Sequence, residues 1–269
     1  MKKSDGDKDL VVTMVKFGGK TIYERCFSLK LKLQVQEMDL VTANGWMRYV
    51  LKWQFMVLYV DKMQRDSGDD FRDFADLCFK NFGDEVKHWT TINEPQLFAM
   101  YGYRVSLSPT GDKVNDPYDA AHNIILSHAA AAKLYKQIYQ AAQEGEIGIS
   151  IVGQWFVSHS DSPRDKEAAE RANGFMVGWF MEPLVYGDYP FIMRALVRDN
   201  LSMFTDKEKE MVKGSYDFIG VNYYTARYAK DIPFTSEHKF TSTDKYQFVA
   251  QKGTYEYSCT TISYVPRTW

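Results

Sequence analysis

Cysteine is scarce in this sequence. The 269 residues include three cysteines, and Cys26, Cys78 and Cys259 lie far apart along the chain. Such spacing fits neither a zinc-binding pattern nor a disulfide framework. The sequence therefore predicts no metal site, and Cys78 is expected to pack as a small apolar side chain.

Net charge and long apolar runs are lacking as well. With 33 Lys and Arg against 35 Asp and Glu, the formal net charge is −2, so no overall field attracts nucleic acid or an anionic membrane. No stretch approaches the roughly 18 apolar residues of a membrane-spanning helix. The charged start "MKKSDGDKDLVV" has no apolar core of the kind that a signal peptide needs. We expect a soluble protein that binds neither nucleic acid nor membrane, and the sequence leaves its compartment open.

Aromatic residues, in contrast, are plentiful at 15% of the chain. They provide stacking surfaces either in a core or in a binding site for sugars or bases. Trp155, Phe156, Trp179 and Phe180 are all expected in the core rather than in a sugar site. Trp155 is the one most open to a ligand-facing role, because it follows a predicted buried strand.

The two parts of the chain differ in their patterns. Residues 1–68 show poor periodicity and form a divergent N-terminal segment, whereas residues 69–269 form a second unit that resembles a folded α/β region. Apolar spacing predicts helices in this unit over 69–84, 118–140, 165–180 and 205–214. Runs rich in β-branched residues predict strands over 86–92, 147–153 and 216–224. Strands that alternate with helices predict an α/β fold with a parallel sheet.

Two of the predicted strands end in polar side chains. The stretch "HWTTINEP" (88–95) delivers Asn93 and Glu94 just before Pro95, which cannot donate to a strand ladder. The strand over 216–224 ends with Asn222 and Tyr224. In (β/α)8 barrels and other parallel α/β folds the carboxyl ends of the strands carry the chemistry. A carboxylate beside an amide and a phenol suits acid/base chemistry on a hydroxylated substrate.

Four longer motifs point to a known family. They are "INEP" followed by a glycine–tyrosine pair, "HNIILSHAAAAKLY", "GWFMEPLVYGDYP" and "YDFIGVNYYT". In this order and spacing they resemble the family 1 glycoside hydrolases, and most of all the plant β-glucosidases, over roughly residues 69–231. The resemblance implies a (β/α)8 barrel that hydrolyses the O-glycosidic bond of a small-molecule β-glycoside with retention of configuration. It implies no cofactor.

The resemblance also assigns roles to single residues. Glu94 matches the family's general acid/base, and Asn93 matches the residue that hydrogen-bonds the 2-hydroxyl of the sugar. Tyr224 matches the phenol that orients the nucleophilic carboxylate, and Asn222 lies beside it in the lining of the site. Tyr101 falls where relatives place an aromatic side chain against the aglycone. The related thioglucosidases carry Gln at the acid/base position, so a Glu there favours O-glycosides.

Parts of the family's pattern are missing from this chain. No element resembles the "ITENG"-type strand that carries the nucleophile, so no nucleophile is identified. After Asp231 the glutamates are Glu237 and Glu256, and neither context resembles that strand. The sugar-gripping "HWD" and "E-W" motifs are absent too. These gaps predict a partial (β/α)8 barrel that lacks the family's C-terminal strands and begins with a divergent segment.

Three interpretations follow from this pattern. The chain is a β-glucosidase-like hydrolase impaired by the lack of its nucleophile region, a catalytically silent glycoside-binding or interaction protein, or the product of a truncated or mispredicted gene. Hydrolysis of an aryl β-glucoside discriminates the first from the second. The sequence does not indicate the aglycone, the exact sugar or the oligomeric state.

Overall fold

A computed structural model of the chain describes residues 16–17, 20–21, 67–100, 112, 114–232, 246–254 and 261–266. Tyr101, Glu237 and Glu256 lie outside the described residues, as does most of the predicted segment 1–68. Within that segment the structure describes two short strands, β1 (Lys16–Phe17) and β2 (Lys20–Thr21), which pair antiparallel.

The strands form a core sheet and a smaller extension. In the core sheet β3 (His88–Asn93), β4 (Glu146–Val152) and β6 (Phe218–Tyr223) pair in parallel in that order, and β9 (Thr261–Pro266) pairs antiparallel with β6. In the extension β5 (Trp155–Ser158) and β7 (Ala226–Asp231) are parallel, and β8 (Val249–Thr254) is antiparallel to β7. The parallel core confirms the predicted α/β fold. The direction of β9 differs from the all-parallel strands of a complete (β/α)8 barrel.

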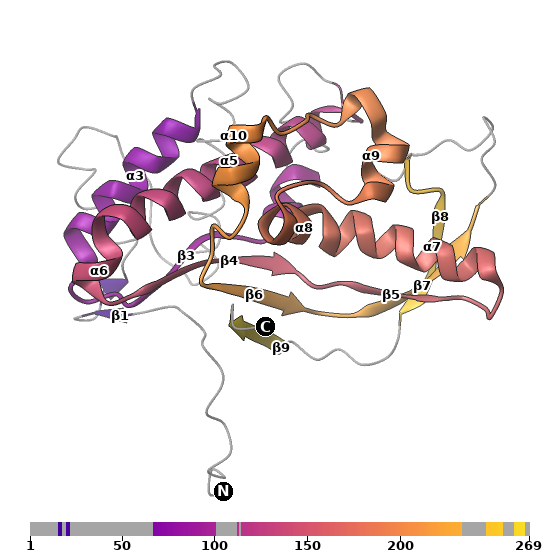
Figure 1. Ribbon diagram of the computed structural model, residues 1–269. Coiled ribbons are helices and arrows are strands. Elements are labelled where there is room, and N and C mark those ends of the chain that lie inside the picture. Colours follow the sequence, from indigo (N-terminus) through magenta and orange to yellow (C-terminus); the bar gives the residue numbers. More distant parts are fainter. Residues whose placement is uncertain are drawn as a thin grey trace, which may run out of the picture.

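Helices cover one face of the core sheet (Figure 1). The longer ones are α3 (Ser67–Phe82), α5 (Asp116–Leu134), α7 (Pro163–Asn173), α8 (Trp179–Tyr186), α9 (Phe191–Val197) and α10 (Asp206–Val212). The short segments are α4 (Pro95–Leu97), η2 (Tyr135–Tyr139), α6 (Gln140–Gln143), η3 (Gly174–Gly178) and η4 (Arg198–Asn200). All four predicted helices are present. The sequence patterns did not predict α9 or the strands β5, β7, β8 and β9.

Local signals account for both ends of α10. Thr205 accepts a hydrogen bond from the backbone N–H of Glu208, and the Glu208 carboxylate accepts one from the backbone N–H of Thr205. This reciprocal capping box begins α10 at the start of the predicted helix over 205–214. Gly214 lies just after α10 with a φ of 71°, a left-handed conformation that glycine adopts without steric cost.

The strand pairing changes register between the core sheet and the extension. Val152 of β4 pairs with Asn222 of β6, yet Trp155 of β5 pairs with Ala226 of β7. Three residues of one chain segment, including Tyr224, therefore lie opposite two of the other. One extra residue on that segment therefore separates the two registers, at the point where the core sheet passes into the extension.

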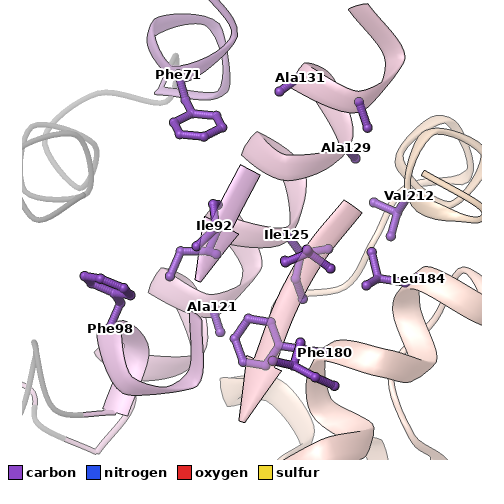
Figure 2. Packing of buried hydrophobic residues seen from close by; sticks show 14 of the residues in the cluster. Phe71, Ile92, Phe98, Ala121, Ile125, Ala129, Ala131, Phe180, Leu184 and Val212 are labelled. Carbon is purple, nitrogen blue, oxygen red and sulfur yellow. The ribbon is translucent and has the colours of Figure 1, made fainter. Parts of the chain in front are cut away.

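Helix α5 lies at the centre of the core because its side chains are small. Its buried residues include Ala121, Ile125, Ala129 and Ala131, and all of these are at most 1% exposed. Figure 2 shows them among Ile92 of β3, Phe180 and Leu184 of α8 and Val212 of α10. Small side chains allow the helix to approach its neighbours closely, and each buried Å² of apolar surface contributes about 25 cal/mol.

His128 links α5 to the sheet. Its ring is fully buried, and Nδ1 lies 2.6 Å from Oγ1 of Thr91 on β3. Oγ1 of Thr91 also lies 3.1 Å from the carbonyl oxygen of Gly148 on β4. The hydroxyl therefore connects the buried ring of α5 to two strands of the sheet. Burial lowers the pKa of His128 from 6.5 to about 3.

This burial predicts acid sensitivity. The unfolded chain binds a proton at His128 near pH 6.5, whereas the folded chain does so only near pH 3. The stability that this histidine contributes is complete above pH 6.5 and is lost as the pH falls below that value. At pH 5 the loss amounts to roughly 2 kcal/mol. Urea unfolding between pH 5 and pH 7 measures it, and His128→Asn should reduce the pH dependence by about this amount.

The control is Ser127→Ala, which changes a buried, non-ionisable side chain on the same helix. It should leave the pH dependence as in the unmodified chain. An unchanged pH dependence in His128→Asn would contradict the prediction.

Candidate active site

Glu94 follows the last residue of β3 in a backbone conformation that residues other than glycine rarely adopt. Its φ is 53° and its ψ is 54°, which places it in the left-handed region. Its N–H donates to the carbonyl oxygen of Ser150 on β4 at 2.7 Å, and its own carbonyl oxygen accepts from Leu97 N at 2.9 Å. Conformations of this kind cluster at functional sites, where the surrounding structure holds them in place.

Gln96 holds the chain just after Glu94. Its side chain is fully buried. Oε1 accepts from the backbone N–H of Val152 at 3.1 Å, and Nε2 donates to the carbonyl oxygens of Val152 and Met176, both at 3.3 Å. The amide thus satisfies backbone groups of β4 beyond the point where β3 ends.

The carboxylate of Glu94 accepts hydrogen bonds from Asn222 on β6 and from Tyr224, which comes directly after β6. Nδ2 of Asn222 donates to Oε1 of Glu94 at 2.9 Å and to Oδ1 of Asn93 at 3.0 Å. The hydroxyl of Tyr224 donates to the same Oε1. Asn222 and Tyr224 are two residues apart, so a strand directs both side chains to one face. The structure therefore brings together four of the five predicted site residues, and the fifth, Tyr101, lies outside the described residues.

Tyr224 acts as a donor in this arrangement. Burial, the hydrogen bond to Glu94 and the negative charge of Glu94 raise the pKa of Tyr224 to about 12. The phenol therefore keeps its proton at neutral pH. The family resemblance places this phenol against the nucleophile, whereas the contact observed here is with Glu94.

Two further polar residues of the site were missed in the sequence. They are Gln96 and Ser150, whose hydroxyl donates to Oδ1 of Asn222 at 3.2 Å. The strand "IGISIVG" was interpreted only as a buried apolar run. A polar side chain in the middle of such a run was the available signal, because a buried hydroxyl needs a partner.

Three of the four aromatic residues predicted to lie in the core are buried, whereas Trp155 is not. Phe156, Trp179 and Phe180 are at most 2% exposed and belong to the core, whereas Trp155 is 50% exposed at the start of β5. The exposed indole of Trp155 is therefore available for stacking, a geometry in which aromatic rings bind sugars and other ligands.

The described residues contain neither a cluster of metal ligands nor a membrane-spanning helix. In the ranges that the structure describes, no three His, Cys, Asp or Glu side chains are grouped as a metal ion would require. None of the helices in the same part of the chain has the length and apolar character needed to cross a membrane.

Comparison with protein families gives a match over most of the chain. The model described as "Glycosyl hydrolase family 1" matches residues 59–267, a wider range than the 69–231 covered by the sequence motifs. Furostanol glycoside 26-O-β-glucosidase of Hellenia speciosa is 52% identical over 181 residues, which cover 63% of this chain and 32% of the relative. Furcatin hydrolase of Viburnum furcatum is 50% identical over 183 residues, which cover 65% of this chain and 34% of the relative. The chain spans about a third of the length of these two relatives.

Solved structures agree with this match. The rice β-glucosidase Os3BGlu6 superposes with a TM-score of 0.66 at 39% identity, covering 70% of this chain and 42% of the rice chain. A family 1 β-glucosidase from the fungus Humicola insolens, in complex with glucose, gives a TM-score of 0.64 at 34% identity, covering 70% of this chain and 41% of the fungal chain. The predicted partial (β/α)8 barrel is therefore confirmed.

The donors on Glu94 lead to a prediction for Asn222→Asp. This change replaces the buried amide that donates to Oε1 by a carboxylate, so that two negative charges meet. Relative to the unmodified chain, we expect a loss of at least about 2 kcal/mol in the free energy of unfolding at pH 7. The loss should shrink at pH 4, where one of the two carboxylates takes up a proton. Urea unfolding at both pH values measures it.

Asn200→Asp makes the same chemical change at an exposed position after α9 and serves as the control. An equal loss for Asn222→Asp at both pH values would contradict the arrangement of donors around Glu94.

Proposed function

This chain belongs to glycosyl hydrolase family 1, and we propose that it acts on small-molecule β-glucosides as an O-glycosyl hydrolase with Glu94 as its general acid/base. One observation carries the proposal. A carboxylate at the carboxyl end of a barrel strand is held by an amide and a phenol from a second strand, through a single oxygen. General acid/base catalysis requires a proton-transferring group held in a defined geometry.

The two oxygens of Glu94 have different surroundings. Asn222 and Tyr224 both donate to Oε1, and no described residue donates to Oε2. We assign Oε2 as the oxygen that passes its proton to the glycosidic oxygen of the substrate and later takes a proton from water. Tyr224 and Asn222 then fix the plane of the carboxylate, and Asn93 is a contact for the sugar.

The second half of the mechanism needs another carboxyl group. In a retaining glycosidase the nucleophile lies about 5–5.5 Å from the acid/base. The sequence contains no element that resembles the family's nucleophile strand. Proton transfer by Glu94 is therefore the step that we assign to this chain, and formation of a covalent intermediate requires a nucleophile from another source.

The substrate class follows from the relatives. Their names describe a furostanol glycoside 26-O-β-glucosidase and a furcatin hydrolase, so we propose a β-glucoside of a small organic aglycone as the substrate or ligand. The exposed Trp155 offers a stacking surface near the carboxyl end of β4. Glu at position 94 favours an oxygen rather than a sulfur linkage, because protonation by a carboxylic acid assists departure of an oxygen leaving group.

The missing nucleophile element favours one alternative, a glycoside-binding protein without turnover. The polar groups around Glu94 and the exposed Trp155 would then bind the sugar without cleaving it. This alternative keeps the same ligand class and removes only the chemistry.

An external nucleophile tests the proposal. The purified 269-residue chain is given phenyl β-glucoside or 2,4-dinitrophenyl β-glucoside, with and without sodium azide. Azide attacks C1 of glucose while the C1–O bond breaks, giving glucosyl azide, and Glu94 protonates the departing phenolate oxygen. We expect azide to increase phenol release from both substrates. Glu94→Gln should lower release from the phenyl glucoside by about 100-fold or more and release from the dinitrophenyl glucoside far less, because dinitrophenolate leaves without protonation.

The matched control is Glu170→Gln, the same change at an exposed position of α7. This variant should cleave both substrates as the unmodified chain does. A folded chain that shows no azide-dependent release would refute the hydrolase proposal. Retained binding of the glucoside in that chain would support the alternative without turnover.

A further inference from the structure

We propose that Ser150 is a positioning residue for Glu94, an inference that deepens the proposed function and rests on it for its catalytic meaning. Ser150 lies on β4, the middle strand of the parallel core, and is 8% exposed. It contacts β3 through its backbone and β6 through its side chain. No other described residue is shown to bind both the backbone of Glu94 and the amide that holds its carboxylate.

The contacts of Ser150 close a circuit of hydrogen bonds across three strands. The N–H of Glu94 donates to the carbonyl oxygen of Ser150 at 2.7 Å. The hydroxyl of Ser150 donates to Oδ1 of Asn222 at 3.2 Å. Nδ2 of Asn222 donates back to Oε1 of Glu94 at 2.9 Å. Ser150 therefore binds the backbone of Glu94 directly and its carboxylate through Asn222.

The hydroxyl of Ser150 also fixes which end of the Asn222 amide faces Glu94. An amide has one accepting oxygen and one donating nitrogen. Because Ser150 donates to Oδ1, the nitrogen is left to face the two oxygen acceptors, Oδ1 of Asn93 and Oε1 of Glu94. Without the hydroxyl, Oδ1 of a buried side chain loses its partner, which costs free energy and loosens the amide.

Gly220 makes room for this hydroxyl. It pairs with Ser150 across β4 and β6, and a Cβ added to Gly220 would lie 2.6 Å from Oγ of Ser150. A methyl group there would have to displace the hydroxyl. The structure thus offers two changes with the same expected effect, one that deletes the hydroxyl and one that pushes it aside.

Substitutions of two other buried serines serve as controls, because they distinguish a positioning role of Ser150 from a general loss of stability. Ser215 is 5% exposed and donates to the carbonyl oxygen of Val212 at the end of α10. Ser215→Ala therefore also removes a hydrogen bond of a buried serine, but outside the circuit. Ser127 is 2% exposed, and its hydroxyl has no partner among the described residues, so Ser127→Ala controls for burial alone.

The first measurement is the azide-supported release of phenol and of dinitrophenol from the two aryl glucosides. Ser150→Ala and Gly220→Ala should lower release of phenol about threefold to tenfold, the factor expected from one net hydrogen bond. Release of dinitrophenol should stay the same, because it does not depend on the proton of Glu94. Ser150→Thr keeps the hydroxyl and should restore the ratio, and Ser215→Ala and Ser127→Ala should not change it.

The second measurement does not depend on turnover. The carboxyl carbon of Glu94, labelled with carbon-13 and assigned with Glu94→Gln, is titrated by NMR in the same variants. Loss of the Ser150 hydroxyl weakens the donor to the carboxylate, so the titration midpoint should move upward in Ser150→Ala and Gly220→Ala and not in Ser215→Ala.

The outcomes separate this inference from the proposed function. If the unmodified chain shows no azide-dependent release but the midpoint moves as described, the hydrolase proposal fails and the positioning role of Ser150 stands. If the midpoint moves equally in Ser150→Ala and Ser215→Ala, or in neither, the inference is wrong whatever the activity. An equal fall in phenol and dinitrophenol release in Ser150→Ala would also overturn it.

Discussion

Parallel pairing places Asn93, Ser150 and Gly220 side by side across β3, β4 and β6, and the polar groups at the carboxyl edge of the sheet depend on that register. Side chains alternate between the two faces of a strand, so a shift of β6 by one residue would turn Asn222 to the opposite face. Glu94 would then lose the donor to Oε1, and Ser150 would lose its acceptor. The apolar core beneath the helices sets the register, because the same shift would expose Ile219, which is now 2% exposed.

The strained backbone of Glu94 depends on the same scaffold. A left-handed conformation costs a residue with a side chain of order 1 kcal/mol or more. Hydrogen bonds from β4 and α4 hold the two sides of this residue, and Gln96 anchors the chain that follows. These contacts hold the strained residue in one conformation and so present its carboxylate in one orientation.

Much of this arrangement could be predicted where the sequence carries local signals. The apolar spacing over 205–214, the apolar stripe of the helix that contains His128 and the β-branched run of β4 each identified an element in the correct place. Asn93, Glu94, Asn222 and Tyr224 were expected together because each stands at or just beyond the end of a predicted parallel strand. The convergence of these four side chains needed only the direction of the strands.

The features that were missed depend on contacts between distant parts of the chain. The acceptor of Ser150 lies 72 residues away, and the backbone groups bound by Gln96 lie up to 80 residues away. Only two residues separate β4 from β5, so the apolar pattern of β5 could not be distinguished in the sequence from that of β4. The contact of Tyr224 with Glu94 rather than with a nucleophile concerns two side chains 130 residues apart. No window of local sequence contains such pairs.

The direction of β9 determines which part of that strand meets the chemistry. Its first residue, Thr261, pairs with Tyr223 beside the polar edge of the sheet, and its last, Pro266, pairs with Phe218 at the opposite edge. Each parallel strand brings to that edge the residues at which it ends, whereas β9 brings those at which it begins. On this flank of the sheet, the order of the chain relative to the polar edge is therefore reversed. A side chain that an antiparallel strand supplies to this edge comes before its strand in the sequence. The search for polar residues at the C-terminal ends of strands, which locates Glu94 and Asn222, would therefore miss it.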